Sequence, residues 1–183
     1  SEIETLLEQP DLSELKGQRD KAMLEVLYST GIRVTELISL KIDDVNLTNG
    51  YIRVKKKNSE RHIPLGNLSL KCLKDYINKV RPLLIRTEEE KTLFLNTNGQ
   101  KMTRQGYWKI LKQYKEQAKI DKDITPHTIR HSFAVHMLQN GAEIKTVQEL
   151  LGHTDIASTM MYTQMADMNV KDDYFNPEHK NIT

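Results

Sequence analysis

The spacing of apolar residues in this chain changes most sharply between residues 45 and 65. On either side, apolar side chains recur every three or four residues, as in residues 70–84, which is the period of an amphipathic helix. Within the stretch they alternate, and Asn49-Gly50 is a strong signal for a tight turn between paired strands. The sequence therefore predicts a mainly α fold with one small antiparallel β-sheet, which is an α+β class.

Capping residues set the bounds of the expected elements. Gly31 and Gly141 stand where helices end, and Thr103 and Thr125 stand where helices begin. We expect helices over residues 2–8, 16–30, 34–38, 70–84, 103–118, 127–140, 143–151 and from 155 toward 162. Strands are expected at residues 51–54, 61–65 and 93–95, with residues 55–60 as the tip of a hairpin.

The chain of 183 residues is long enough for one domain with a real hydrophobic core. We expect this domain over residues 1–164, followed by a C-terminal tail over residues 165–183. A single cysteine, Cys72, excludes an internal disulfide and fits a reducing, cytoplasmic setting. No apolar stretch approaches the ~20 residues that a membrane helix needs, so we expect a soluble protein without membrane contact.

The charged residues are segregated along the chain, although 27 basic and 25 acidic side chains nearly cancel. Residues 1–14 carry acids without a base, and residues 100–115 carry bases without an acid. A second basic cluster lies at the expected hairpin. Local positive charge is what neutralises phosphates, so the clusters indicate a polyanionic partner on one face, with ordinary solvated helix faces as the alternative.

Four segments hold polar residues where folding alone does not require them. They are residues 30–37, the lysine hairpin, residues 127–131, and residues 150–153 with a tyrosine nine positions after His153. Each segment alone is more often an ordinary surface or core feature. The four occur together in one order, which makes the set specific.

This set resembles the tyrosine recombinases, the phage integrase and Xer family, and the resemblance covers essentially the whole chain as their catalytic domain. It assigns the catalytic roles to Arg33, Lys56, His127, Arg130, His153 and the nucleophile Tyr162. The sequence segments at residues 28–37 and 150–153 also resemble the corresponding segments of Xer proteins. The hairpin tip usually reads Gly-Lys-Gly in this family but is Lys55-Lys56-Lys57 here, so either neighbour of Lys56 could replace it.

The resemblance implies the tyrosine recombinase catalytic-domain fold and a site-specific recombinase that cuts and rejoins DNA through a 3′-phosphotyrosyl intermediate. The implied partner is a double-stranded DNA recombination site. The protein is expected to be a monomer when free and a tetramer on paired DNA sites, in the cytoplasm at the nucleoid. The family's N-terminal core-binding domain is absent from this chain, and residues 165–183 are expected to pass to a neighbouring subunit. The expected DNA-binding residues are Lys55, Lys57, Arg61, Lys101, Arg104, Lys109 and Lys112.

The chemistry of these residue types fits phosphodiester cleavage independently. Guanidinium groups such as those of Arg33 and Arg130 are permanently charged donors for the negative charge that builds on the phosphate oxygens. A phenol with a pKa near 10 needs a proton acceptor, and His127 is the best candidate to activate Tyr162.

The remaining site residues take complementary roles. His153 is placed to donate a hydrogen bond to a phosphate oxygen, and Lys56 to protonate the departing 5′ oxygen. A covalent phosphotyrosine conserves the energy of the broken bond, so no nucleotide, metal or other cofactor is expected. Asp20 and Glu36 are expected to orient helices or pair with arginines, and His131 and His136 to be a buried hydrogen-bonded histidine and a partly exposed one.

Three other functions remain open from the residues. A type IB topoisomerase uses a similar set of side chains, but the Xer-like sequence segments argue against it. A DNA-binding module with a vestigial site is a second alternative, which the intact Tyr162 opposes. A metal-dependent hydrolase is the most distant, because His127 and His131 have the i,i+4 spacing of a zinc site but lack the intervening glutamate.

Overall fold

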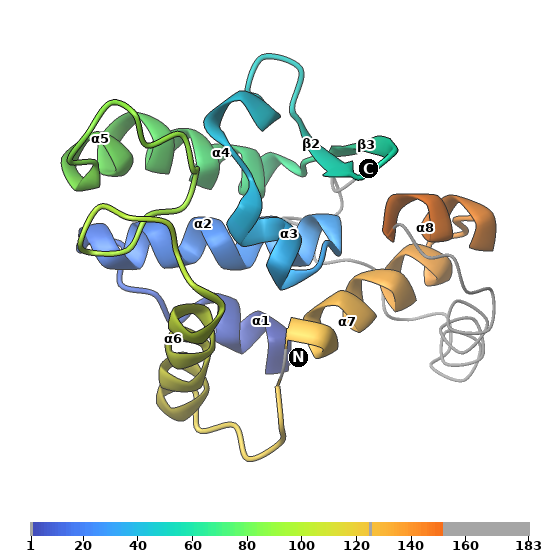
Figure 1. The fold of residues 1–183 in the computed structure, drawn as a ribbon. Helices are drawn as coiled ribbons and strands as arrows, with labels where there is room; N and C mark the ends of the chain where they lie inside the picture. The colour runs from blue at the N-terminus through green and yellow to red at the C-terminus, as the bar shows by residue number, and fades with distance from the viewer. Residues whose placement is uncertain (1, 125, 152–183) are drawn as a thin grey trace.

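A long central helix, α2 (Leu15–Thr30), organises the protein. The computed structural model describes residues 2–124 and 126–151, without the side chains of residues 126, 127, 150 and 151. In Figure 1, α2 runs through the middle, with α4 (Asn67–Asp75) on one side and α1 (Glu2–Leu7) and α6 (Arg104–Gln117) on the other. Every residue of α2 from Ala22 to Thr30 is buried, so this helix is the core around which the others pack.

The helices follow the expected bounds closely. After α2 come α3 (Val34–Ser39) and the short 3-10 helix η1 (Ile42–Asp44); α7 (Pro126–Gln139) and α8 (Ile144–Leu151) complete the described chain. Gly31 ends α2 at φ 67°, a left-handed conformation that glycine adopts without strain. Thr103 caps α6 as predicted, since its Oγ1 accepts the Gly106 N–H at 2.9 Å.

The small antiparallel sheet is confirmed. Its strands are β1 (Val45–Asn46), β2 (Tyr51–Lys56) and β3 (Ser59–Pro64), in the order β1-β2-β3. Ile52, Val54 and Ile63 point into the core. The hairpin is longer than predicted, because Lys55 and Lys56 pair with Glu60 and Ser59 and so belong to the strands.

The helix expected over residues 70–84 begins earlier and is interrupted. It consists of α4, a π-helical turn η2 (Tyr76–Val80) and α5 (Arg81–Leu84). Pro82 lacks an N–H and its ring crowds the preceding turn, so it cannot continue a regular α-helix and lies instead in the first turn of α5.

The strand predicted at residues 93–95 is wrong. These residues are buried, but pairing is limited to isolated bridges, Lys41 with Thr92 and Leu95 with Lys101. A side chain supplies part of what a neighbouring strand would: the Tyr76 hydroxyl donates to the Leu93 carbonyl at 2.8 Å and accepts the Leu95 N–H at 3.0 Å. The Leu93 N–H donates to the Leu40 carbonyl, and the Phe94 carbonyl accepts the Met102 N–H. The apolar run predicted burial correctly but not the way its backbone groups are satisfied.

A buried ionic group joins α2 to α6. The Arg19 guanidinium donates to Asp20 at 2.8 and 3.0 Å, and the Tyr114 hydroxyl donates to the other oxygen of the same carboxylate. Asp20 thus pairs with an arginine, as expected, but with its chain neighbour. No helix in the described part of the chain is long and apolar enough to cross a membrane.

Candidate active site

The turn between α2 and α3 brings two of the predicted arginines together. Arg33 directly precedes α3 and is exposed to solvent. Arg130 reaches the same turn from α7, where its Nε donates to the Gly31 carbonyl oxygen at 2.8 Å. Arg130 is only 5% exposed, so this hydrogen bond fixes a nearly buried guanidinium. Its acceptor, Gly31, lies two residues before Arg33 in the chain.

Glu36 on α3 ties the turn to the lysine hairpin. Its carboxylate accepts the Arg33 backbone N–H at 2.9 Å and two hydrogen bonds from the Arg61 guanidinium, each also 2.9 Å. Burial alone would raise the pKa of the Glu36 carboxyl. The hydrogen bonds from Arg61 and Arg33 and the charges of Arg61 and Arg130 outweigh burial, and the pKa lies below its ordinary value.

Lys56, the last residue of β2, shares this electrostatic environment. Desolvation is the largest cause of its lowered pKa, followed by the positive charge of Arg61. Arg33 and Arg130 lower the pKa further, and Glu36 opposes them. The structure therefore gathers Arg33, Lys56 and Arg130, which come from three separate elements, into one cluster where an ammonium releases its proton more readily than in water.

Of the other predicted catalytic residues, the structure describes only the backbone position of His127. His127 lies three residues before Arg130 in α7, so the two positions share a face of that helix. His153 and Tyr162 lie outside the described residues. Helix α8, which ends two residues before His153, contacts both α7 and β3, so the described chain leads toward the cluster (Figure 1).

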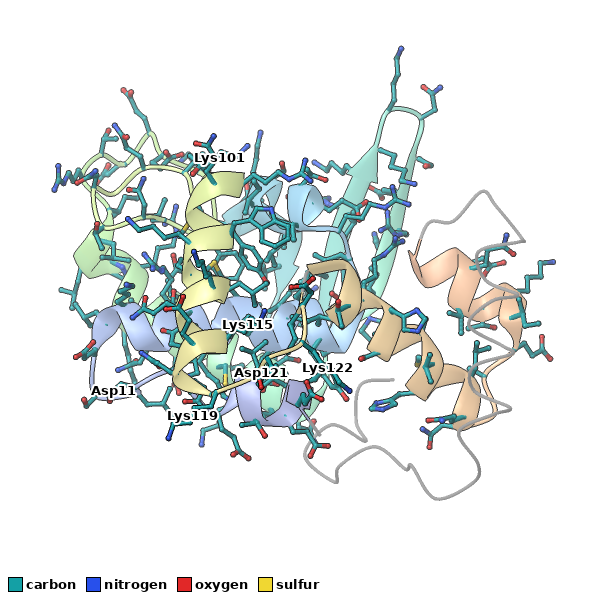
Figure 2. All side chains as sticks on the ribbon, turned by 90° about the horizontal axis from the view of Figure 1, so that it is seen from below. Asp11, Lys101, Lys115, Lys119, Asp121 and Lys122 are labelled. Carbon is teal, nitrogen blue, oxygen red and sulfur yellow. The ribbon has the colours of Figure 1, made fainter. Side chains whose placement is uncertain are left out.

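The predicted DNA-binding residues divide into two kinds. Six of them are exposed, namely Lys55, Lys57, Lys101, Arg104, Lys109 and Lys112. Figure 2 shows that the β2–β3 hairpin and the Lys101 end of α6 project toward the same side of the molecule. Arg61 differs from the rest, because its side chain is 13% exposed and is paired with Glu36.

A model of the phage integrase family matches residues 1–169. The chain belongs to the phage integrase family. The family suggested by the sequence motifs is therefore confirmed.

Relatives of this phage integrase family member include Xer recombinases. Tyrosine recombinase XerD of Staphylococcus epidermidis is 50% identical over 179 residues, which cover 96% of this chain and 61% of the relative. The chain thus spans about three fifths of the length of the curated relative. XerD of Listeria monocytogenes is 49% identical over 180 residues, which again cover 96% of this chain and 61% of that protein.

Two solved structures support the predicted fold. The crystal structure of XerA recombinase superimposes with a TM-score of 0.79 at 30% identity, covering 94% of this chain and 64% of that chain. XerH bound to palindromic difH substrate in a post-cleavage complex gives 0.79 at 27% identity, covering 92% and 49%. The predicted tyrosine recombinase catalytic-domain fold is therefore confirmed.

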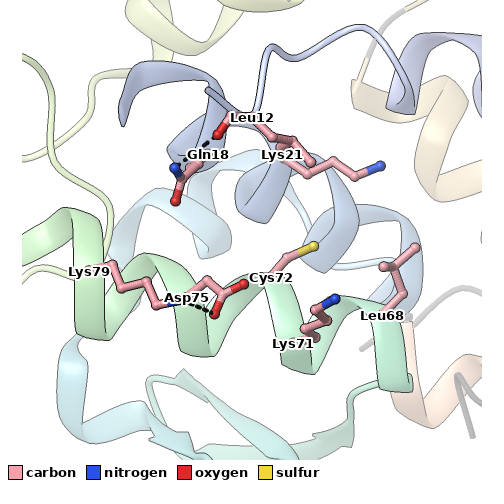
Figure 3. Close-up of a pocket in the computed structure, with 8 residues that line it drawn as sticks. All are labelled: Leu12, Gln18, Lys21, Leu68, Lys71, Cys72, Asp75 and Lys79. Atoms are coloured by element: carbon pink, nitrogen blue, oxygen red, sulfur yellow. Dashed lines mark hydrogen bonds and ion pairs between the residues drawn. The ribbon is translucent and has the colours of Figure 1, made fainter. Parts of the chain in front are cut away.

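A hollow of about 330 Å³ lies away from the charged cluster of this phage integrase family member, between the start of α2 and α4 (Figure 3). It contains none of the predicted catalytic residues. It is lined by Leu12, Gln18, Lys21, Leu68, Lys71, Cys72, Asp75 and Lys79. Burial raises the pKa of the Cys72 thiol to about 11, so this cysteine is protonated and a poor nucleophile at neutral pH.

Of the two histidines expected to be structural, only His131 differs from its predicted environment. His131 is half-buried rather than buried, since it lies at the margin of the apolar face that Phe133 and Ala134 contribute to the core. His136 is half-buried, as expected, and its Nδ1 lies 2.9 Å from the Tyr28 hydroxyl. This pair joins the C-terminal half of α7 to the last turn of α2.

The sequence left the arginine partner of Glu36 and the anchor of Arg130 unidentified. A Glu three residues after a helix-capping position often bonds back to that residue's N–H, so the Arg33–Glu36 bond had a recognisable signal. The Arg61–Glu36 pair and the Arg130–Gly31 bond join residues far apart in the chain and had none.

Proposed function

We propose that this chain is the DNA-cutting and rejoining part of a site-specific recombinase that acts through a 3′-phosphotyrosyl intermediate. The observation that carries the proposal is the convergence of Arg33, Arg130 and Lys56 at the turn between α2 and α3. Membership of the phage integrase family and high identity to tyrosine recombinases support it. The same relatives disfavour a topoisomerase or a vestigial binding module.

The arginines stabilise the transition state. Attack on a phosphodiester places extra negative charge on the non-bridging oxygens, and Arg33 and Arg130 donate hydrogen bonds to those oxygens. Arg130 is held in advance by the Gly31 carbonyl, so little reorganisation accompanies the reaction.

Bond making and bond breaking use the remaining groups. The Tyr162 oxygen forms a bond to phosphorus while His127 accepts the phenol proton. The bond from phosphorus to the 5′ oxygen breaks, its electron pair stays on that oxygen, and Lys56 supplies the proton that neutralises it. His153 donates to a non-bridging oxygen, and rejoining runs the same steps in reverse.

The assembly around DNA is part of the proposal. Duplex recombination-site DNA contacts the exposed lysines of the hairpin and of α6, and a tetramer forms on two paired sites from free monomers at the nucleoid. Residues 1–164 form the catalytic domain, and residues 165–183 pass to a neighbouring subunit. The XerH neighbour bound to difH substrate supports DNA as the partner.

Covalent capture tests the function. The protein is incubated with duplexes that carry a Xer recombination site and a nick next to the scissile phosphate, so that the cut end diffuses away. A denaturing gel should show protein joined to the 3′ phosphate in the wild type and none in Tyr162→Phe. A covalent adduct that persists in Tyr162→Phe, or its absence in the wild type on every Xer site tried, contradicts the proposed function.

A further inference from the structure

Arg61 is the predicted DNA-binding residue whose surroundings least resemble those of a phosphate contact. It lies on β3 opposite Val54, and its Nη1 and Nη2 donate to Oε2 and Oε1 of Glu36, both at 2.9 Å. Both side chains are 13% exposed. A two-pronged arginine–carboxylate pair that is largely removed from water is directional and much stronger than an exposed ion pair.

This pair joins the hairpin to the helix that begins beside Arg33. The same Glu36 carboxylate accepts the Arg33 N–H, so one side chain fixes both β3 and the first turn of α3. Lys56 is on β2, which pairs with β3 residue by residue, so the position of Arg61 constrains the position of Lys56. An anchored hairpin therefore holds Lys56 at a set distance from Arg33.

Charge gives the pair a second effect. Glu36 next to the cluster would attract Lys56 and Arg33 and repel a DNA phosphate if its charge were not balanced. The Arg61 guanidinium balances the charge of Glu36. The guanidinium groups of Arg33 and Arg130 therefore stay available to bind the phosphate.

We propose that Arg61 is a positioning residue, which through Glu36 fixes the β2–β3 hairpin and the Lys56 ammonium against Arg33, and that it does not bind a DNA phosphate. The inference rests on the proposed function only where it concerns cleavage. The anchoring itself is a property of the free protein. Two experiments separate these parts.

The first experiment uses the protein without DNA. Lysine side chains are labelled with ¹³C and ¹⁵N, the Lys56 signal is assigned from its loss in Lys56→Arg, and its pKa is followed by NMR. In Arg61→Gln the hairpin loosens, a neighbouring cation is lost and Glu36 is unbalanced, and each change raises the pKa of Lys56. Hydrogen exchange of the β2 and β3 amides should quicken in the same variant.

The matched control is Arg53→Gln. Arg53 is also a hairpin arginine paired with a carboxylate, because its Nε lies 3.2 Å from Asp44, but that partner belongs to η1 and not to α3. The Lys56 pKa should shift less in Arg53→Gln than in Arg61→Gln. Equal hydrogen exchange of the β2 and β3 amides in the two variants, or an unchanged Lys56 pKa in Arg61→Gln, overturns the anchoring.

The second experiment measures single-turnover cleavage with DNA in saturating amounts. Arg61→Gln should slow cleavage by up to roughly 100-fold, the loss that a misplacement of about 1 Å can cause. A substrate with sulfur as the 5′ bridging atom needs no proton for departure, so it should restore most of the rate if Arg61 acts through Lys56. Arg61→Lys keeps the charge but not the fork and should fall between Arg61→Gln and the wild type.

A phosphate-binding role predicts the opposite pattern. Arg61→Gln would then weaken DNA binding and reduce its salt dependence, while cleavage of the saturated complex would stay near normal on both substrates. That result overturns the proposal. If the wild type forms no covalent adduct, the proposed function fails, and the hydrogen exchange of the β2 and β3 amides in the free protein still decides whether Arg61 anchors the hairpin.

Discussion

Arg130 and Gly31 are 99 residues apart in the chain, yet the Arg130 Nε donates to the Gly31 carbonyl oxygen at 2.8 Å. This bond closes α7 onto the turn that follows α2. Gly31 therefore has two roles, because its left-handed backbone ends α2 and its carbonyl anchors a predicted catalytic arginine.

Gly31→Ala tests this double role. A side chain at φ 67° strains the backbone by roughly 1–2 kcal/mol, and relaxing that strain moves the carbonyl that holds Arg130. We expect denaturant curves to show a loss of this size together with a strong loss of cleavage. Gly50→Ala, at φ 73° in the turn before β2, is the control with similar strain and should affect cleavage less. Equal cleavage in the two variants contradicts the anchoring role.

Arg33 and Arg130 should differ in what their removal costs. Arg33→Ala removes an exposed side chain, so it should reduce cleavage by roughly 2.7–4 kcal/mol of transition-state stabilisation with little change in folding stability. Arg130→Ala should lose cleavage similarly and also destabilise the fold, because the buried Gly31 carbonyl loses its donor. Cleavage rates and urea midpoints check both variants. A loss of DNA affinity without a loss of cleavage rate would show that the two arginines bind DNA and do not stabilise the transition state.

The identity of the general acid can be tested among the three hairpin lysines. Lys55 and Lys56 are neighbours on β2, so their side chains point to opposite faces of the strand, and the Lys55 Nζ lies 3.8 Å from Asp44. Lys56→Met should therefore slow cleavage far more than Lys55→Met or Lys57→Met. The 5′ bridging sulfur substrate should rescue only the variant that lacks the acid, and rescue of a different lysine variant reassigns the role.

The pH dependence of stability should report the Glu36 pair. The pKa of the Glu36 carboxyl is lower in the folded protein than in the unfolded chain, so the unfolded state binds more protons as the pH falls. The resulting stabilisation is fully present above the ordinary glutamate pKa of about 4.3 and is lost as pH falls through the lowered value. Denaturant titrations should show a shallower acid loss for Glu36→Gln and Arg61→Gln than for the wild type; identical slopes would argue against the lowered pKa.

Truncation addresses the tail. Residues 167–178 combine four acids with apolar side chains and one lysine, which suits burial against protein better than contact with DNA. Deleting residues 168–183 should leave a folded protein that binds DNA, with altered cleavage and no strand exchange. Normal recombination by the truncated protein on paired sites would show that no exchange between subunits is needed.

Local pattern was enough to predict most of the helices and the sheet. Helical spacing and glycine stops located α2, and alternation around Asn49-Gly50 located the hairpin, because these signals depend on near neighbours. The strand at residues 93–95 failed, since an apolar run predicts burial without saying which group accepts its N–H. The Leu95 N–H donates to the Tyr76 hydroxyl, which lies 19 residues away in the chain.

The predicted site shows the same division. Motif order placed Arg33, Lys56 and Arg130 at positions that the structure brings together. Their surroundings could not be predicted, because the Arg61–Glu36 pair spans 25 residues and its formation depends on how the hairpin packs on α3. The basic charge of Arg61 predicts DNA contact, but charge alone does not reveal that this side chain also has an internal partner, Glu36.

The strand order also bears on how the protein resists aggregation. In the order β1-β2-β3, strand β3 lies at the margin of the sheet, where unpaired backbone groups can recruit a strand from another molecule. Pro64 lacks one of the donors that such recruitment uses, the charged Glu60 discourages close approach, and α8 packs nearby. A protein that displays a long hairpin is thereby protected from unwanted edge-to-edge association.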